Sequence, residues 1–154
     1  MEGEEKYWNM TSDNVLSICL CDVDEDEVQE LVVGCEDSSI NIFKGEELIN
    51  EIEETSAVIL LKSFGIQFFA FGLRNGSFGV YERGTRIWKE KYKEGIVGMV
   101  PVIKEEEFGG LIVGFRNGRV ELRNSMNGSL LYNMQAEGQI SSIMRSNFVD
   151  FESN

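Results

Sequence analysis

Histidine is absent from this 154-residue chain, and its absence removes the residue on which much enzyme chemistry depends. Serine or cysteine nucleophiles activated by an imidazole, histidine-ligated metals and the usual proton shuttle near neutral pH are excluded. Long apolar runs are also lacking: the longest, Ala57 to Leu61, is far shorter than the roughly 20 residues that cross a bilayer. We therefore expect no enzyme activity, no catalytic residue and no membrane insertion.

Basic residues are few. Lys and Arg number 14 against 27 Asp and Glu, which gives a formal charge of -13, so nucleic acid and anionic membranes are repelled over most of the surface. Three cysteines, Cys19, Cys21 and Cys35, lack CxxC spacing and are expected to be reduced, buried and structural. The acidic first residues do not resemble a secretory signal, so the sequence predicts a cytoplasmic protein.

A repeat is the most informative feature that is present. An apolar triplet followed by Gly occurs at Leu31 to Gly34, Phe69 to Gly72 and Leu111 to Gly114, and these glycines are 38 and 42 residues apart. Turn residues follow each Gly, an apolar strand precedes each triplet, and two further alternating segments complete each unit. Four short antiparallel strands in about 40 residues are typical of one blade of a β-propeller.

The sequence thus predicts an all-β chain, a partial β-propeller of about three four-stranded antiparallel blades. We place the blades of this single domain at residues 14–54, 55–93 and 94–137, with part-blades at 1–13 and 138–154. Inner strands facing one axis are expected at Val15 to Cys21, Ala57 to Leu61, Ile96 to Ile103 and Ile140 to Met144. Because a propeller closes with roughly four to eight blades, three blades describe an arc. Either the chain is a fragment of a longer protein, or the missing blades come from elsewhere.

The densest charged cluster lies between the first two strands of the first blade. Asp22, Asp24, Asp26 and Glu30 have the alternating spacing by which a loop can wrap a hard cation such as Ca²⁺ in oxygen ligands. The segment resembles the calcium loop of FG-GAP propeller blades, except that Glu27 stands where that motif has Gly for the sharp turn. The alternatives are a weak Ca²⁺ site and a solvated acidic turn, and no other cofactor is expected.

Two other sets of residues have both a functional and a structural interpretation. Arg74 and Arg116 precede Asn-Gly turns and could meet an acidic partner, but exposed decoration of a hairpin is the preferred interpretation. Trp8 and Trp88 fall on outer-strand segments, where packing between blades is favoured over anchoring of a partner.

An ordered set of motifs resembles a known family. Leu31 to Lys44, Arg74 to Tyr81 with Thr85 to Trp88, and Gly114 to Arg123 together resemble the amino-terminal β-propeller of the Bardet-Biedl syndrome 2 protein family. The resemblance implies a subunit of the BBSome, a coat-like complex for protein transport that carries membrane proteins into and out of cilia.

The resemblance also implies partners and a location. The partners are other BBSome subunits, Bardet-Biedl syndrome proteins 7 and 9, and the tails of membrane-protein cargo. The location is the cilium, the basal body or a coat associated with the ciliary membrane. The function expected is that of a non-enzymatic protein-protein interaction scaffold, and the alternative is a calcium-binding, FG-GAP-like module in adhesion or sensing.

Overall fold

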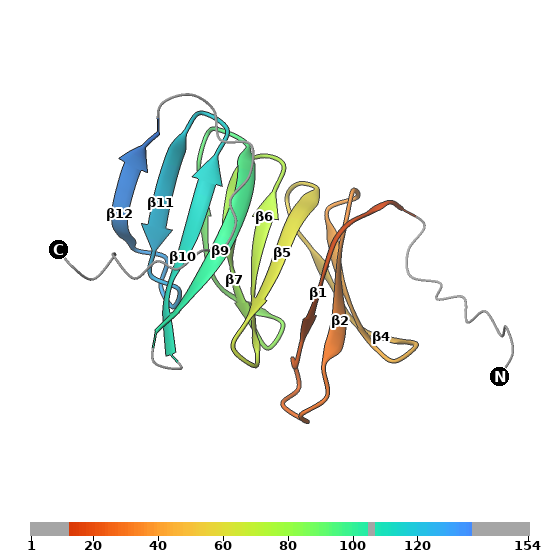
Figure 1. Ribbon diagram of the computed structural model, residues 1–154. Helices are drawn as coiled ribbons and strands as arrows, with labels where there is room; N and C mark the ends of the chain where they lie inside the picture. The colour runs from red at the N-terminus through yellow and green to blue at the C-terminus, as the bar shows by residue number, and fades with distance from the viewer. Residues whose placement is uncertain (1–12, 105–106, 137–154) are drawn as a thin grey trace, which may run out of the picture.

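The computed structural model describes residues 13–104 and 107–136, and all of its regular structure there is β-strand (Figure 1). The strands form three four-stranded sheets, here called blades 1, 2 and 3. Blade 1 contains β1 (Val15–Cys21), β2 (Glu30–Cys35), β3 (Ser39–Lys44) and β4 (Glu47–Glu53). Blade 2 contains β5 (Val58–Phe64), β6 (Phe68–Leu73), β7 (Ser77–Glu82) and β8 (Thr85–Lys91). Blade 3 contains β9 (Ile96–Lys104), β10 (Glu107–Phe115), β11 (Arg119–Arg123) and β12 (Leu130–Gln135).

Each blade is an antiparallel meander whose strand order follows the chain. The turns explain this order, because tight hairpins need residues that tolerate positive φ. Ser38, Gly76 and Gly118 have φ values of 75°, 90° and 92° in the turns between the second and third strands of the three blades. These are the turns that the sequence repeat predicted.

The three blades stand side by side, with β1 next to β5 and β5 next to β9 (Figure 1). The first strands of the blades therefore line one side of the stack, and β4, β8 and β12 lie at the opposite edge of their sheets. The all-β class and the partial-propeller architecture of the prediction are confirmed.

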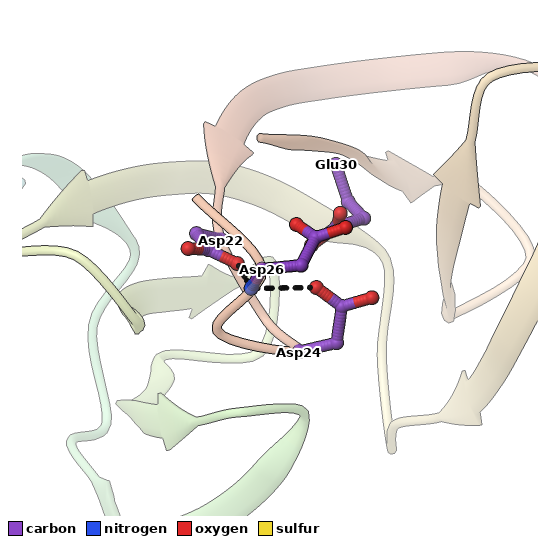
Figure 2. Close-up of side chains that lie close together, drawn as sticks. All are labelled: Asp22, Asp24, Asp26 and Glu30. Carbon is purple, nitrogen blue, oxygen red and sulfur yellow. Dashed lines mark hydrogen bonds between the residues drawn. The ribbon is translucent and has the colours of Figure 1, made fainter. Parts of the chain in front are cut away.

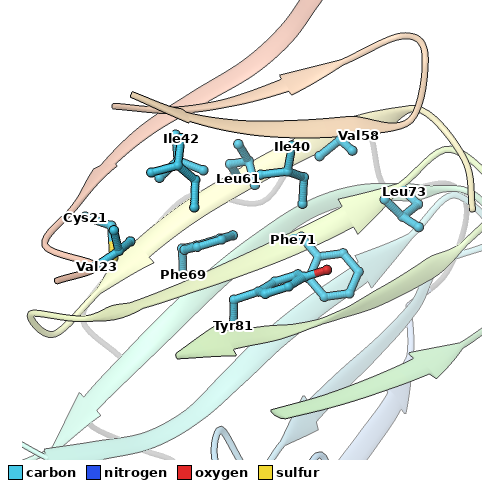
Figure 3. Packing of buried hydrophobic residues seen from close by; sticks show 11 residues of the cluster. Cys21, Val23, Ile40, Ile42, Val58, Leu61, Phe69, Phe71, Leu73 and Tyr81 are labelled. Atoms are coloured by element: carbon cyan, nitrogen blue, oxygen red, sulfur yellow. The ribbon is translucent and has the colours of Figure 1, made fainter. Parts of the chain in front are cut away.

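Apolar side chains between the blades form the core. Ile40 and Ile42 of blade 1 pack on Phe69, Phe71 and other residues of blade 2 (Figure 3). A second cluster joins blades 2 and 3, and it consists of Phe64, Ala70, Phe78, Val80, Trp88, Ile96, Met99, Leu111, Val113 and Phe115. Both faces of blade 2 are therefore buried, which explains why Phe69, Ala70 and Phe71 are fully buried in succession along one strand.

The repeated Gly has a packing cause that the sequence pattern did not reveal. A Cβ placed on Gly34 would lie 2.6 Å from Val58 Cγ1 of the next blade, and 2.4 Å from Ser17 Oγ. A Cβ on Gly72 would lie 3.2 Å from Met99 Sδ of blade 3. Only Gly allows neighbouring blades to approach this closely near their inner strands.

Blade 3 differs in one detail from the prediction. The predicted inner strand of blade 3 ends at Ile103, before the segment that corresponds to the acidic loop of blade 1. Instead, β9 continues to Lys104 and β10 begins at Glu107, which pairs with Lys104. The ladder runs on because Phe108 pairs with Ile103, and both residue types favour strands.

Other expectations lie beyond what the structure describes. Trp8, the strand at residues 140–144 and the part-blades, apart from Asp13, fall outside the described residues. The blade limits and the single-domain assignment stay predictions. No helix in residues 13–104 or 107–136 has the length and apolar character needed to cross a membrane.

Candidate functional site

In the loop between β1 and β2, the aspartate side chains accept hydrogen bonds from backbone N–H groups of the same loop. Asp22 accepts hydrogen bonds from the N–H groups of Asp26 at 3.2 Å and of Glu27 at 2.9 Å. Asp24 accepts a third bond, from the Asp26 N–H at 3.3 Å, and Asp26 accepts one from the Val28 N–H at 2.9 Å. Each aspartate is thereby oriented by the chain that follows it, as short polar side chains are in Asx turns.

The four predicted residues converge into one group, called here the acidic cluster: Asp22, Asp24, Asp26 and Glu30. One carboxylate oxygen from each lies within 4.8 Å of one from every other member. Figure 2 shows Asp24 and Asp26 beside Asp22, with Glu30 reaching toward them. Asp22 and Glu30 are buried, whereas Asp24 and Asp26 are exposed. The cluster has the chemistry to hold a hard cation, and its binding of a metal ion stays a prediction.

Glu30 is the unusual member of the cluster, because it is a fully buried acid with an incomplete set of partners. Its Oε2 accepts a 2.7 Å hydrogen bond from the Val23 N–H, but its Oε1 has no hydrogen-bond partner. Burial raises the pKa of this carboxyl; the Val23 N–H opposes that rise, and the charges of Asp24 and Asp26 add to it.

Lys44, at the end of β3, is the cation of the site. Its Nζ lies 2.5 Å from Asp24 Oδ2 and also bonds Asp26 Oδ2. The hydrogen bond from Lys44 is the main cause of a lowered pKa of Asp26. Lys44 was not predicted from the sequence, because its closeness to the loop depends on the pairing of β2 with β3.

The backbone of the loop shows why the sequence position of Glu27 matters. Glu25 and Glu27 have φ values of 61° and 69°, in the left-handed region that Gly adopts without a penalty. Position 27 thus has the conformation for which the calcium-loop motif uses Gly, and Glu adopts it at a cost of about 1–2 kcal/mol. The departure from the motif therefore lies in the residue type and not in the turn.

The loop is also attached to blade 2. The Asp22 N–H donates to Ile66 O at 3.0 Å, and Glu25 pairs with Arg83. The Cys21 thiol points at the same Ile66 carbonyl, at 3.7 Å, and burial followed by the charges of Glu30 and Asp22 raises its pKa to about 12. An open hollow of about 540 Å³ beside the loop is lined by Asp22, Glu27, Gln29, Gly65 and Ile66. The conformation of this loop is therefore coupled to the contact between blades 1 and 2.

A second buried acid, Glu54, ties blade 1 to blade 2. Its Oε1 accepts from the Tyr81 hydroxyl and from Arg86 at 3.2 Å, and its Oε2 accepts from Lys89 at 2.8 Å. Burial raises the pKa of Glu54, but the hydrogen bonds from Lys89 and Tyr81 outweigh that effect and hold the pKa below its usual value. This network was not predicted from the sequence, because Glu54 is 27 to 35 residues away from its partners.

Trp88 lies at the joint between blades 2 and 3. Its indole N–H donates to Ser125 O at 2.8 Å, and its ring meets Phe78 edge-on at 6.0 Å. A Cβ on Gly128 would lie 2.6 Å from the indole, so the turn after β11 rests on its face. The preference for inter-blade packing of Trp88 is confirmed.

The two turn arginines are exposed, and each contacts a neighbouring segment. Arg74 forms a bidentate salt bridge with Glu36. This contact links the turn after β6 in blade 2 to the turn after β2 in blade 1. The Arg116 backbone N–H donates to Gly95 O at 2.8 Å. Arg74 is therefore already paired with an acid of its own chain. Cys21 and Cys35 are buried, as expected, whereas Cys19 is only half-buried.

Stacked four-stranded meanders with their first strands side by side define the class of β-propellers. The structure is similar to the WD40 domain of coronin from Toxoplasma gondii, with a TM-score of 0.66 and 12% identity over 81% of this chain and 34% of that one. It is also similar to BBS1N, solved in complex with ARL6DN, with a TM-score of 0.68 and 17% identity over 82% of this chain and 41% of that one.

Residues 17–123 match the family described as ciliary BBSome complex subunit 2, middle region, and the chain belongs to that family. It is 32% identical over 148 residues to human BBSome complex member BBS2, which covers 96% of this chain. The chain spans about a fifth of the length of that relative. The resemblance seen in the sequence is thus confirmed, and the family description places the matched segment in the middle region of the subunit.

Proposed function

We propose that this chain is part of a non-enzymatic scaffold, three contiguous propeller blades of a BBSome subunit that helps carry membrane proteins to and from cilia. The observation that carries the proposal is the family match, which extends from β1 to the last residue of β11. Two buried acids support a structural role: Glu54, at the joint of blades 1 and 2, and Glu121, within blade 3, are both paired with cations of the same chain.

The partners proposed are other BBSome subunits, in particular Bardet-Biedl syndrome proteins 7 and 9, and the tails of membrane-protein cargo. Exposed apolar side chains on the outermost strand of blade 3 offer contact area: Leu130, Leu131, Tyr132 and Met134 are 42–55% exposed. Such concentrations of exposed apolar surface favour protein association. The proposed location is cytoplasmic, at the cilium, the basal body or a coat associated with the ciliary membrane.

Binding to defined subunits tests the proposal. The chain, carrying an affinity tag, is co-expressed with proteins 7 and 9 of the same organism, together or singly, and the eluate is analysed by size-exclusion chromatography with light scattering. We expect a stoichiometric complex with at least one of them. An unrelated acidic WD40 propeller serves as the control bait and should retain neither. Elution of the chain free of both subunits would contradict the scaffold role.

One observation favours a second candidate, a calcium-binding propeller module in adhesion or sensing. That observation is the acidic cluster. The two functions differ in what Ca²⁺ does to partner binding: an adhesion or sensing module needs the ion to bind its partner, whereas the scaffold binds its subunits with or without it. Repeating the co-purification in Ca²⁺ and in a chelator separates the two functions.

A further inference from the structure

The outer strands of the three blades differ in how they protect their free edges. Within the described residues, β4, β8 and β12 each pair with one neighbour, so each presents a row of backbone N–H and C=O groups on its other side (Figure 1). Three of the seven residues of β4 and four of the seven of β8 are charged, whereas none of the six of β12 is. Charged side chains on an edge strand oppose its pairing with another chain. Strand β12 lacks this protection.

Strand β12 is also accessible along its whole length. All of its residues, from Leu130 to Gln135, are exposed, whereas β8 buries Trp88 near its centre. The segment contains large apolar side chains, no Pro and no Gly, and such uncharged, exposed edges are the ones to which a further strand adds.

Backbone hydrogen bonds show which residues of β12 direct their amides away from the blade. The Ala136 N–H donates to Gly118 O of the turn before β11 at 2.8 Å. Amides along an antiparallel strand point alternately to either side, so the N–H of Asn133 points away from β11. The same bond recurs after β4 and β8, and it places Glu51 and Lys89 at the position equivalent to Asn133.

This position decides whether an outer strand can pair with its own copy. When two identical strands pair antiparallel about a two-fold axis through this position, the residue there meets itself. Glu51 would meet Glu51 and Lys89 would meet Lys89, and like charges directly opposite each other are destabilising. Asn133 would meet Asn133, whose amide can both donate and accept, and Tyr132 would lie opposite Met134 of the second copy. Of the three outer strands described, β12 alone is complementary to itself.

From this comparison we propose that β12 pairs antiparallel with β12 of a second copy of this chain, which joins blade 3 of both copies into one continuous sheet. The proposal goes beyond the scaffold role and does not depend on it, because pairing uses the backbone edge and leaves both faces of the blade free. The contact is only one strand long, and each copy carries a charge of -13. We therefore expect weak pairing, with a Kd of about 10⁻⁵–10⁻⁴ M.

Solvent exchange of individual amides, measured by NMR on the 154-residue chain at about 10 µM and about 1 mM, tests the pairing. The amides of Asn133 and Gln135 point outward and should exchange about fourfold more slowly or less at the higher concentration, because the second copy accepts their hydrogen bonds. The amides of Glu51 and Glu53 occupy the equivalent positions of β4 and should exchange at the same rate at both concentrations. Association through a face of the blade would not protect outward amides of the edge in this way.

Two substitutions and a matched control locate the contact. Asn133→Pro removes the outward N–H, which no strand of the blade uses, so the blade should fold while the slowing at Gln135 disappears. Asn133→Lys places like charges opposite each other and should have the same effect, although it lowers the net negative charge of the chain. Glu51→Pro makes the proline change at the equivalent position of β4 and should leave the slowing at Gln135 as it is in the parent chain.

Three results would overturn the proposal. The first is exchange at Asn133 and Gln135 that does not depend on concentration, and this measurement on the parent chain is decisive even if the variants fail to fold. The second is equal slowing at Glu51 and Glu53, which would mean general association. The third is slowing at Gln135 that persists in a folded Asn133→Pro or Asn133→Lys variant.

Discussion

At the scale of residues, three buried glutamates differ in how completely their carboxylates are hydrogen-bonded or ion-paired. Glu54 is surrounded by Lys89, Arg86 and the Tyr81 hydroxyl. Glu121 is held between two arginines of its own strand, Arg119 at 2.7 Å and Arg123 at 2.9 Å. Glu30 alone of the three keeps an oxygen without a hydrogen-bond partner. Because the carboxylates of Glu54 and Glu121 are paired with cations, the incompletely hydrogen-bonded Glu30 marks the candidate site.

The Glu54 network predicts a pH dependence. A carboxyl whose pKa is lowered in the folded chain stabilises it fully above its unfolded pKa of about 4.5, and this stabilisation is lost as the pH falls through the folded pKa. Glu54→Gln should therefore lower the free energy of unfolding by about 1–3 kcal/mol at pH 7. The difference in this free energy between the variant and the parent chain should become smaller below about pH 4.5.

Urea unfolding at a series of pH values between about 3.5 and 7 measures this difference. Glu51→Gln, at an exposed position of β4, should change stability little at any pH and serves as the control. The opposite result is a difference in free energy of unfolding between Glu54→Gln and the parent chain that is the same at every pH. That result would mean that Glu54 acts through its shape and not through its charge.

The residues of the candidate site were predictable to a limited extent. The alternating Asp22, Asp24 and Asp26 identified the cluster, because ligand spacing within one loop is local information. Lys44 and the Glu54 network were not found, because strand pairing and blade stacking bring these groups together from positions far apart in the sequence. A charged residue at the end of the strand that pairs with a loop-bearing strand is a signal that could have identified Lys44.

At the scale of elements, the repeated glycine sets the distance between blades. Gly34 faces Val58, and Gly72 faces Met99, each across a joint. The sequence revealed the period of this Gly, which was sufficient to predict the number of blades and the strand order. It did not reveal the reason for the Gly, because the close approach exists only once the blades are stacked.

The substitution Gly34→Ala tests the close approach. The new methyl group would meet Val58 Cγ1 at 2.6 Å, so blade 1 must shift away from blade 2 at a cost of about 1–3 kcal/mol. Gly95→Ala is the matched control, because a Cβ there meets its nearest neighbour, Arg116, at an ordinary 3.8 Å. Chemical unfolding of both variants gives the comparison, and equal stability of the two would contradict the packing role of Gly34.

The strand ladders show a limit of prediction at this scale. Strand β1 has the bounds that the sequence predicted, whereas β9 and β10 extend further than expected. The acidic loop of blade 1 ends its hairpin early, because Asp22 and the residues after it bond to their own backbone in place of a partner strand. Where no such local bonds compete, the ladder continues until the chain must turn.

At the scale of the whole molecule, one face of blade 3 repeats a row of apolar residues that the next blade covers in blades 1 and 2. The cross-strand rows Val32–Ile42 in blade 1 and Ala70–Val80–Trp88 in blade 2 pack against the next blade. The row at the same position of blade 3 is Ile112–Leu122–Tyr132. Ile112 is buried, whereas Tyr132 is 55% exposed and Met134, in the neighbouring row, is 47% exposed. We expect a further blade to cover the exposed part of this face.

We therefore expect the isolated chain to self-associate and to become monodisperse when the remaining blades of its ring are supplied. The charge of -13 opposes association, but at physiological ionic strength it is screened beyond about 8 Å, whereas apolar and strand contacts act at touching distance. Sedimentation velocity over a range of concentrations measures the association. Tyr132→Lys should weaken it, whereas Ile66→Lys, the same change at a 70% exposed turn, should leave it unaltered. A parent chain that stays monomeric throughout, or equal effects of the two variants, would show that this face of blade 3 is not the contact.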